Sequence, residues 1–498
     1  MLNIILLYLV LVLAVCVLAR YTYRWYKNRN ILTPPIFPGS VPLIGHAPMV
    51  IGDCVHMWKV LTRLSDYCLQ NKGIATLNLA VMDLQIITDP DIFVTVSNNF
   101  LDKAYVYDFG RDWLGDGMIT GSGAIATRSH KLLGPAFNSQ VLNGYLEVFN
   151  SQSRVLIESF GKEMHKGPID HINHFTTLTV ESLCLTSMGL DSEEWGIQKD
   201  VYLRVIQDLQ KIMIARFTRV WLHPTFLFNL SNFKKEQDRL VKLSNDMMLK
   251  LIRTKRLNRK KNDNSDNNGT SRSKFQSFLD ILLEISEGSN VLSDKQMKDE
   301  VETMMLAGHE TTGYTFVSVL MMLGSYQDVQ QKVYEECKAV FGDTDRDVEK
   351  DDLPKLVYME AVLMEVMRLY PVVPIIGRYV DSDTKLRDFT IKAGTSCVLS
   401  VYGIQRHPMW GPDAHQFRPE RWLDKASLPQ HPAAFSAFGR GKRACIGKMY
   451  AMMLMKTTVA HILRRYHVTA DVTQLVLKFN VVLEPDSGHF ITIRRRDK

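Results

Sequence analysis

A cysteine within a glycine-rich, basic segment is the first candidate for chemistry in this sequence. Cys445 lies in the segment 438–447, which reads FGRGKRACIG. Glycines before and after the cysteine let the backbone approach a flat ligand closely. Lys442, Arg443 and a helix expected to begin at Met449 should lower the pKa of the thiol, and the thiolate is a soft, electron-rich metal ligand. Taken alone, an inert cysteine beside a basic loop explains the segment better.

A second segment is suited to proton transfer. Residues 307–312 read AGHETT and lie inside an apolar pattern from 301 to 323 that predicts a long helix. Its small residues admit a flat cofactor, and the Thr311 hydroxyl can bond the carbonyl of Ala307 and loosen the helix. Glu310 and Thr311 would then form an acid–alcohol pair that relays protons. Taken alone, a solvated face for Glu310 and helix packing for Thr311 are the simpler interpretations.

Two more segments carry paired charges. Glu365 and Arg368 are three positions apart in a helical pattern, so both side chains lie on one helix face. Arg421 follows in FRPERW at 417–422, a segment that by itself predicts a turn. Each segment alone indicates no more than a surface ion pair of little energetic value or an ordinary turn.

Composition excludes several classes of protein. The chain has 498 residues, of which 46% are hydrophobic and 23% charged, values typical of a globular protein. The net charge is +7, and the sequence has no dense basic tract, so nucleic acid is not an expected partner. Seven widely spaced cysteines without a CxxC motif argue against a disulfide framework or a zinc cluster and favour a reducing compartment.

The N-terminus predicts a membrane anchor. Residues 2–19 are almost wholly apolar and uncharged, which is near the lower limit for a helix that spans a bilayer. Cations and aromatic residues follow directly, an arrangement that suits the headgroup zone and keeps the rest of the chain cytosolic. A cleaved signal peptide is the weaker alternative, because no basic region precedes the apolar run. With an anchor, the sequons at Asn229 and Asn268 stay unglycosylated.

The rest of the sequence predicts a mostly α protein with small β-sheets. Repeated prolines exclude a helix and predict a stiff hinge within residues 20–46. The pattern then becomes mainly helical, and a polar stretch at 257–274 predicts a solvated loop. Short strands are expected at 389–391, at 396–400 and on both sides of a turn at 484–488. Length alone suggests about three domains.

In their order and spacing, the four segments together resemble the cytochrome P-450 superfamily. The resemblance runs from Pro38 to the C-terminus, and a chance match to all four segments is improbable. It implies the fold of that superfamily, with one large domain at 47–498 after an N-terminal transmembrane helix at 1–19 and a hinge at 20–46. This replaces the expectation of three domains. The segments most similar to the family-4-like insect enzymes are GHETT at 308–312, PAF at 135–137 and GKR at 441–443.

The resemblance implies a role for each candidate residue. Cys445 would bind the iron of haem b, and Thr311 with Glu310 would deliver protons during O2 activation. Arg378 and Arg443 would pair with the haem propionates, because arginine binds a carboxylate through two parallel hydrogen bonds. The other residues implied to contact the cofactor are Phe438, Gly441, Gly447, Ala307 and His130. The structural triad of the superfamily is matched by Glu365, Arg368 and Arg421.

Two positions depart from the superfamily pattern. Members usually carry Trp and, four residues later, Arg on the helix before PAF, where this chain has Ala126 and His130. One propionate contact therefore lacks its usual residue, and His130 is the candidate replacement. Many family-4 fatty-acid ω-hydroxylases carry Glu at position 307, where it can esterify the haem. Ala307 has no carboxylate, so we expect a non-covalent haem, and the ω-hydroxylase interpretation is weakened.

The predicted activity is NADPH-dependent insertion of one oxygen atom of O2 into a lipophilic small molecule, at the cytosolic face of the endoplasmic reticulum membrane. Electrons would come from NADPH–cytochrome P-450 reductase, with cytochrome b5 as a second candidate partner. Three lysines are candidates for the docking face, although general solubility explains them equally well: Lys131, Lys442 and Lys448. A haem-thiolate isomerase or dehydratase and a non-catalytic haem or ligand-binding protein are the alternatives. The pocket is expected to use residues 102–123, 205–228 and 372–377 and the turn near Gly488.

Overall fold

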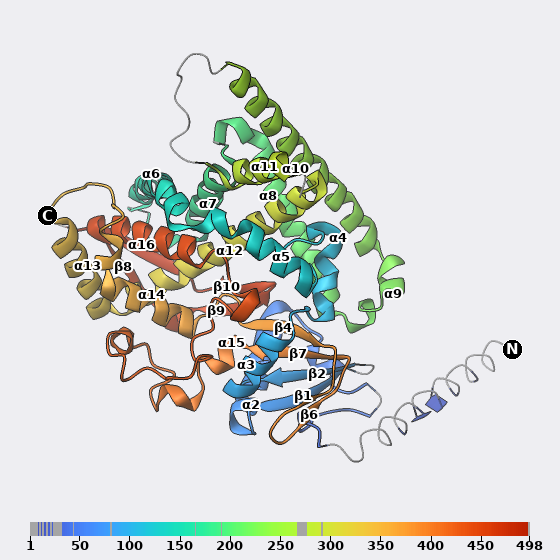
Figure 1. The fold of residues 1–498 in the computed structure, drawn as a ribbon. Helices are drawn as coiled ribbons and strands as arrows, with labels where there is room; N and C mark the ends of the chain where they lie inside the picture. The colour runs from blue at the N-terminus through green and yellow to red at the C-terminus, as the bar shows by residue number, and fades with distance from the viewer. Residues whose placement is uncertain are drawn as a thin grey trace.

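The computed structural model describes residues 32–42, 44–79, 82–164, 166–190, 192–265, 276–289 and 292–496, with isolated positions between 8 and 22. The described chain is mainly helical with small sheets, which confirms that part of the predicted fold class. Most helices gather in one part of the molecule, and the largest sheet lies at the opposite end together with α2 and α3 (Figure 1).

The helices vary from single turns to rods of more than thirty residues. Those of the N-terminal half are α2 (Cys54–Gln70), α3 (Pro90–Asn99), α4 (Arg111–Leu114), α5 (Gly123–Leu133), α6 (Ser139–Glu163), α7 (Ile172–Leu183), α8 (Ser192–Thr218), α9 (Thr225–Asn229) and α10 (Asn232–Ser265). Those of the C-terminal half are α11 (Phe278–Ser289), α12 (Asp294–Ser325), α13 (Gln327–Phe341), α14 (Val357–Leu369), α15 (Val401–Ile404) and α16 (Lys448–Arg465).

The largest sheet joins segments that are far apart in the sequence. Its strand order is β1 (Ile74–Leu79), β2 (Met82–Ile87), β7 (Thr395–Ser400) and β4 (Ile375–Val380). Strand β7 is parallel to β2 and antiparallel to β4. The smaller sheets are β3 (Ile169–Asp170) with β11 (Phe490–Arg495) and β8 (Tyr466–Ala470), β9 (Val476–Asn480) with β10 (Val482–Ser487), and β5 (Thr384–Lys385) with β6 (Thr390–Ile391).

Helix α12 lies at the centre of the helical part (Figure 1). It begins with a capping box, in which Ser293 and Gln296 satisfy each other's backbone N–H groups. Most of its side chains are buried, and it packs against α7, α14 and β8. A side chain at Gly308 would meet Leu183 at 2.9 Å, so glycine allows the close approach of the two chain segments.

The described part of the predicted hinge is packed against the largest sheet. Ile36 forms a parallel bridge with Thr76 of β1, and Phe37 is 2% exposed. The buried His46 ring places Nε2 at 2.7 Å from the Phe37 carbonyl oxygen. The proline-rich hinge segment therefore packs along the edge of strand β1.

Two local predictions are wrong. Residues 257–265 continue α10, where Arg259 donates to the Asp280 carbonyl. The rest of the predicted loop, 266–274, lies outside the described residues. Residues 484–487 belong to strand β10, so the predicted turn is confined to Gly488 with φ 73°, and the tight turn between paired strands lies earlier, at Val481 with φ 47°. Strand β10 pairs with β9, and β11 pairs with β8 instead.

The predicted anchor at 1–19 lies mostly outside the described residues. Within the parts of the chain that are described, no helix combines the length and the apolar character needed to cross a bilayer.

Candidate active site

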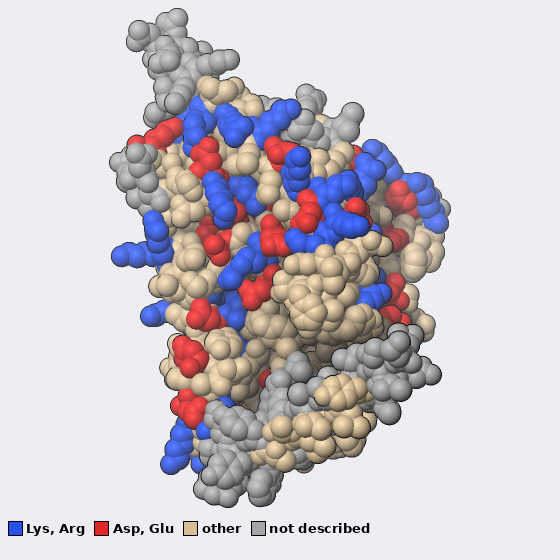
Figure 2. All heavy atoms as spheres, turned by 90° about the vertical axis from the view of Figure 1, so that its right-hand side faces the viewer, with Lys and Arg blue, Asp and Glu red and all other residues tan. Residues whose placement is uncertain are grey.

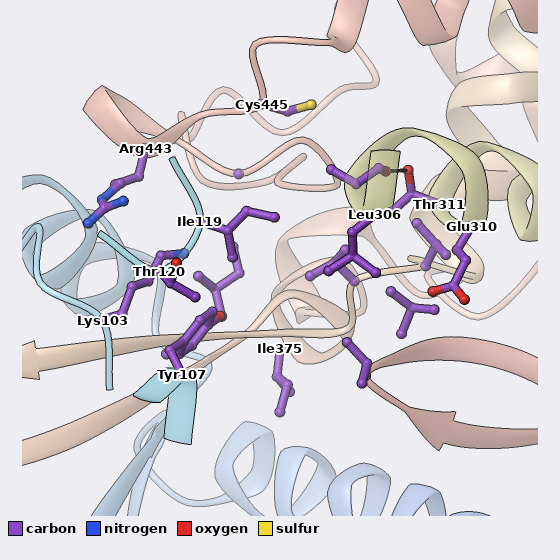
Figure 3. A pocket seen from close by; sticks show the side chains of 18 of the residues that line it. Lys103, Tyr107, Ile119, Thr120, Leu306, Glu310, Thr311, Ile375, Arg443 and Cys445 are labelled. Atoms are coloured by element: carbon purple, nitrogen blue, oxygen red, sulfur yellow. Dashed lines mark hydrogen bonds between the residues drawn. The ribbon is translucent and has the colours of Figure 1, made fainter. Parts of the chain in front are cut away.

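An internal cavity of about 490 Å³ brings together the segments that the sequence singled out. Figure 3 shows Arg443 and Lys103 at one end of it, Thr311 and Glu310 at the other, and Cys445 between these two ends. The volume is in the range of small-molecule sites. The cavity therefore lies between helix α12 and the loop that precedes α16.

The loop before α16 presents the Cys445 thiol to this cavity. Gly439 and Gly441 adopt φ values of 68° and 63°, which a residue with a side chain rarely adopts. The Cys445 N–H donates to the Phe438 carbonyl at 2.8 Å and closes the loop. Gly447 is the N-cap of α16, and a side chain there would lie 3.8 Å from Cys445 Sγ.

The predicted lowering of the Cys445 pKa is wrong for this structure. Burial raises the pKa of the thiol, and the Gly447 N–H and the Lys448 charge only partly offset that effect. Lys442 is exposed, and Arg443 directs its N–H groups to the carbonyls of Leu101, Met118 and Gly121 instead. Desolvation by the surrounding protein outweighs the local cations, although the Cys445 side chain is accessible from the cavity.

Helix α12 supplies the acid and the alcohol. Thr311 Oγ1 donates to the Ala307 carbonyl at 2.5 Å, the back-bond that the sequence suggested. Burial raises the pKa of Glu310 to about 7, although a hydrogen bond from Gln210 lowers it. Gln210 Nε2 donates to Glu310 Oε2 at 2.6 Å. Glu310 is thus a buried carboxyl that changes protonation near neutral pH.

The other end of the cavity is strongly basic. Lys103 and Arg443 line it, whereas the predicted propionate ligand Arg378 does not. Arg378 is 1% exposed, and its Nε has no hydrogen-bond partner among the described residues. Burial and the nearby charges of Arg378 and Arg443 lower the pKa of Lys103 well below its usual range. The Lys103 ammonium lies 4.6 Å from the centre of the Tyr107 ring. Such a set of partly desolvated cations is stabilised by an anionic ligand.

Ala126 and His130 of helix α5 are the two residues that differ from the superfamily pattern at this helix. Ala126 is 1% exposed and lines the cavity where a tryptophan is usual. The His130 ring places Nε2 at 3.3 Å from the Ala444 carbonyl, next to Cys445 in sequence. His130 therefore contacts the cysteine loop, and Lys103 supplies the additional cation of this region.

Glu365, Arg368 and Arg421 come together as a buried cluster. Arg368 donates to both carboxylate oxygens of Glu365 at 2.8 Å, and Arg421 Nε donates to Oε1 at 3.0 Å. Arg368 also donates to the carbonyls of Gln405 and Ala414. The pair is not the surface ion pair that its spacing alone suggested, because none of the three residues exceeds 1% exposure.

Comparison with known proteins decides the assignment. A model of the cytochrome P450 family matches residues 34–492. The chain belongs to the cytochrome P450 family. Human cytochrome P450 4V2 is 28% identical over 96% of this chain and 92% of that protein. Cytochrome P450 4d2 of Drosophila melanogaster is 31% identical over 82% and 84%, and cytochrome P450 4c21 of Blattella germanica is 30% identical over 76% and 77%.

These relatives confirm the family-4-like character that the motifs indicated, insect members included. The protein is therefore an enzyme of the P450 monooxygenase class, whose cofactor is a haem iron. The cavity of this P450 fits that group on independent grounds. It offers a thiol for the metal and small residues on α12 for a flat ring. At its basic end Lys103 and Arg443 line the cavity, with the charge of the buried Arg378 close to Lys103, so two propionates would find cations there.

The predicted pocket segments line the cavity except for the turn near Gly488. That turn packs on the Gln474 backbone, and the residues that reach the cavity come from the earlier β9–β10 turn. Sequence reasoning missed the apolar residues of α2 and of strands β1 and β2 that also line it. Those residues are Met57, Val60, Leu61, Leu64, Leu77, Leu79, Leu84 and Ile86.

We predict that the haem of this P450 is held without a covalent bond. Ala307 lines the cavity and has no carboxylate to form an ester. Chromatography in acid and denaturant should separate all of the haem from the polypeptide. Haem that migrates with the protein would contradict this and would point to Glu300 or Glu310, the acids that line the cavity among the described residues. In the converse test, Ala307→Glu should retain part of the haem after treatment with peroxide.

Proposed function

We propose that this P450 inserts one oxygen atom of O2 into a lipophilic small molecule, with electrons from NADPH delivered by a flavoprotein reductase. The observation that carries the proposal is the apolar cavity that joins Cys445 to Glu310 and Thr311. Apart from those residues and its basic end, its walls are mostly aliphatic and aromatic. An apolar cavity of this kind favours a substrate with little charge.

The residues of α12 would control the protons of the reaction. The haem iron, when bound through Cys445, supplies the activation of O2, which consumes protons. With a pKa of about 7, Glu310 can both give up and take up a proton near neutral pH. Thr311 Oγ1 can accept a proton while its own hydroxyl proton moves into the cavity. The apolar walls exclude the bulk water that would otherwise supply protons at random.

Thr311→Ala should uncouple NADPH consumption from product formation. The variant loses the Oγ1 that accepts and donates protons, but it keeps the cavity and the cysteine loop. With purified reductase we expect NADPH oxidation to continue, product per NADPH to fall about tenfold or more, and peroxide to rise. Thr311→Ser keeps a hydroxyl and should retain most of the coupling. Unchanged coupling in Thr311→Ala would exclude this role.

The same assay tests the reaction class. Oxygenated product that requires NADPH, reductase and O2 supports the proposal. Rearrangement of a peroxide without reductase would instead indicate an isomerase or dehydratase.

The surface around the cysteine loop is the proposed docking face for the reductase, and for cytochrome b5 if it takes part. Lys131 on α5, Lys442 and Lys448 are exposed, and α5 contacts the segment Gly441–Arg443. Cations on one face attract an acidic partner and accelerate its association. Lys131→Glu with Lys442→Glu should raise the KM for reductase several-fold without changing the absorption spectrum of the haem protein. An unchanged KM would contradict this assignment.

We also propose that the protein resides at the endoplasmic reticulum membrane, with an anchor at 1–19, a hinge at 20–46 and the catalytic domain at 47–498. Large apolar side chains are exposed around α9, namely Trp221, Phe226, Leu227 and Leu230. Helix α9 lies on the right-hand side of Figure 1, and Figure 2 shows a continuous uncharged area on that side. Exposed apolar patches of this kind are typical of interaction surfaces. In protein lacking residues 1–19, Phe226→Ser with Leu230→Ser should weaken retention on vesicles; equal retention of that protein with and without the two substitutions would exclude the patch.

A further inference from the structure

Gln210 joins helix α8 to the acid on α12. The side chain is 3% exposed, and its Nε2 donates to Glu310 Oε2 at 2.6 Å. Met213, Ile214 and Phe217 follow at three, four and seven positions, so all four lie on one face of α8. These three residues line the cavity. Gln210 is therefore the polar member of an apolar stripe that touches whatever fills the cavity.

The bond from Gln210 favours the charged form of Glu310, against the larger effect of burial. His309 Nε2 lies 3.7 Å from Glu310 Oε1, but burial lowers the pKa of His309 to about 4, so this ring is neutral at pH 7. Burial and then the Glu484 charge on β10 raise the pKa of Glu310, and the Gln210 bond opposes both. Tyr314, one turn further along α12, is hydrogen-bonded to Glu484. Its hydroxyl is neutral, because burial raises its pKa.

The position of the carboxylate is as informative as its charge. Figure 3 shows the Glu310 carboxylate turned away from the Thr311 hydroxyl, which is occupied by the Ala307 carbonyl. Glu310 must leave Gln210 before it can reach Thr311. The hydrogen bond from Gln210 on α8 thus keeps the Glu310 carboxyl away from Thr311, the residue to which it would deliver a proton.

We propose that Gln210 is a positioning residue that couples the contents of the cavity to proton delivery, by holding Glu310 on α8 until a molecule in the cavity displaces the stripe. The inference rests on the proposed function and deepens it. After release, the Glu310 carboxyl donates its proton to Thr311 Oγ1, and the Thr311 hydroxyl proton passes into the cavity. Water then returns a proton to the Glu310 carboxylate, so the cycle is balanced.

The first test follows the Glu310 carboxyl by infrared spectroscopy of the full-length haem protein, with the band assigned through Glu310→Gln. In the wild type this band should titrate near pH 7 and shift when 1-phenylimidazole fills the cavity. In Gln210→Leu the carboxylate loses its donor, so its titration should move up by about one pH unit or more. The response to 1-phenylimidazole should disappear.

The second test uses the reaction with reductase in the absence of a substrate. Wild-type protein with Glu310 held on α8 should send most NADPH electrons to peroxide. Gln210→Leu should divert a larger share to water, because its acid is free to serve Thr311. Gln207→Leu is the matched control, since Gln207 is an exposed glutamine on the same helix. It should behave like the wild type in both tests.

Gln210→Asn provides a second route to the same result, because the shorter side chain does not reach Glu310 but remains polar. If either Gln210 variant titrates like the wild type and keeps its response to 1-phenylimidazole, the proposal is overturned. All variants should keep the red-shifted Soret band of the reduced CO complex. Loss of that band in the wild type would instead overturn the proposed function, so the two failures are distinguishable.

Discussion

Cys445→Ala should completely abolish the red-shifted Soret band that the reduced CO complex of a haem-thiolate protein shows. The thiol of Cys445 lines the cavity, and among the described cysteines no other one does. A thiolate ligand donates electron density to the iron, and alanine has no atom to replace it. The measurement is the difference spectrum of the reduced protein with and without CO. A surviving band would refute the assignment of Cys445.

Matched variants separate this effect from a loss of folding. Cys337 and Cys397 are buried in apolar surroundings, and burial raises the pKa of each thiol to about 12. Both are therefore neutral packing residues that cannot serve as thiolates at pH 7. Cys337→Ala and Cys397→Ala should lower stability by a few kcal/mol at most and leave the band in place.

The sequence predicted helix α12 better in its second half than in its first. Apolar residues from 301 to 323 have helical spacing, so that part was visible from the pattern alone. The first turns carry Lys298, Asp299, Glu300 and Glu302, charged residues that do not extend the apolar pattern, yet all four are buried. Lys298 donates to the Trp113 carbonyl, and Asp299 accepts from the Asp116 N–H. Such long-range partners have no signature in local spacing.

In the candidate site too, residues in local motifs were predicted from the sequence, and residues that depend on distant partners were not. The segments around Cys445 and Thr311 were recognisable because their functional residues are close together in the chain. Lys103 and Gln210 were missed, since each is a single polar residue without a motif and its role depends on neighbours a hundred or more positions away. The pKa of Cys445 was predicted in the wrong direction, because adjacent cations are visible in the sequence and burial is not.

Glu365→Gln should have the largest effect on stability. The carboxylate is 0% exposed and accepts hydrogen bonds from Arg368 and Arg421, and from Trp422 Nε1 at 2.9 Å. Removing its charge leaves the buried Arg368 guanidinium without its counter-ion and leaves Arg421 with only the Asp413 carboxylate at 3.3 Å, which costs about 3–5 kcal/mol. That is a large part of the 5–15 kcal/mol typical of folded proteins. The expected results are a thermal midpoint lower by about 3–5 °C and poor retention of haem.

The loss should extend to the cysteine loop, because Arg368 also holds the chain that leads to it. Its guanidinium donates to the carbonyls of Gln405 and Ala414, and Gln405 Oε1 accepts from the Ser436 N–H. Glu335→Gln on α13 is the matched control, since that carboxylate is exposed and its replacement should change stability by about 0.5 kcal/mol or less. Equal midpoints for the two variants would contradict the buried-triad argument.

The same carboxylate gives the protein a defined sensitivity to acid. Burial alone would raise the pKa of Glu365, but the hydrogen bonds and charge of Arg368 lower it below the usual value for glutamate. A carboxyl with a lowered pKa stabilises the folded state above its ordinary pKa and loses that contribution as the pH falls through the folded-state value. Wild-type unfolding should therefore become easier in acid, whereas Glu365→Gln has no such carboxyl to protonate and should show a flatter dependence. A parallel pH dependence of the two proteins would mean that the triad does not contribute to stability through its charge.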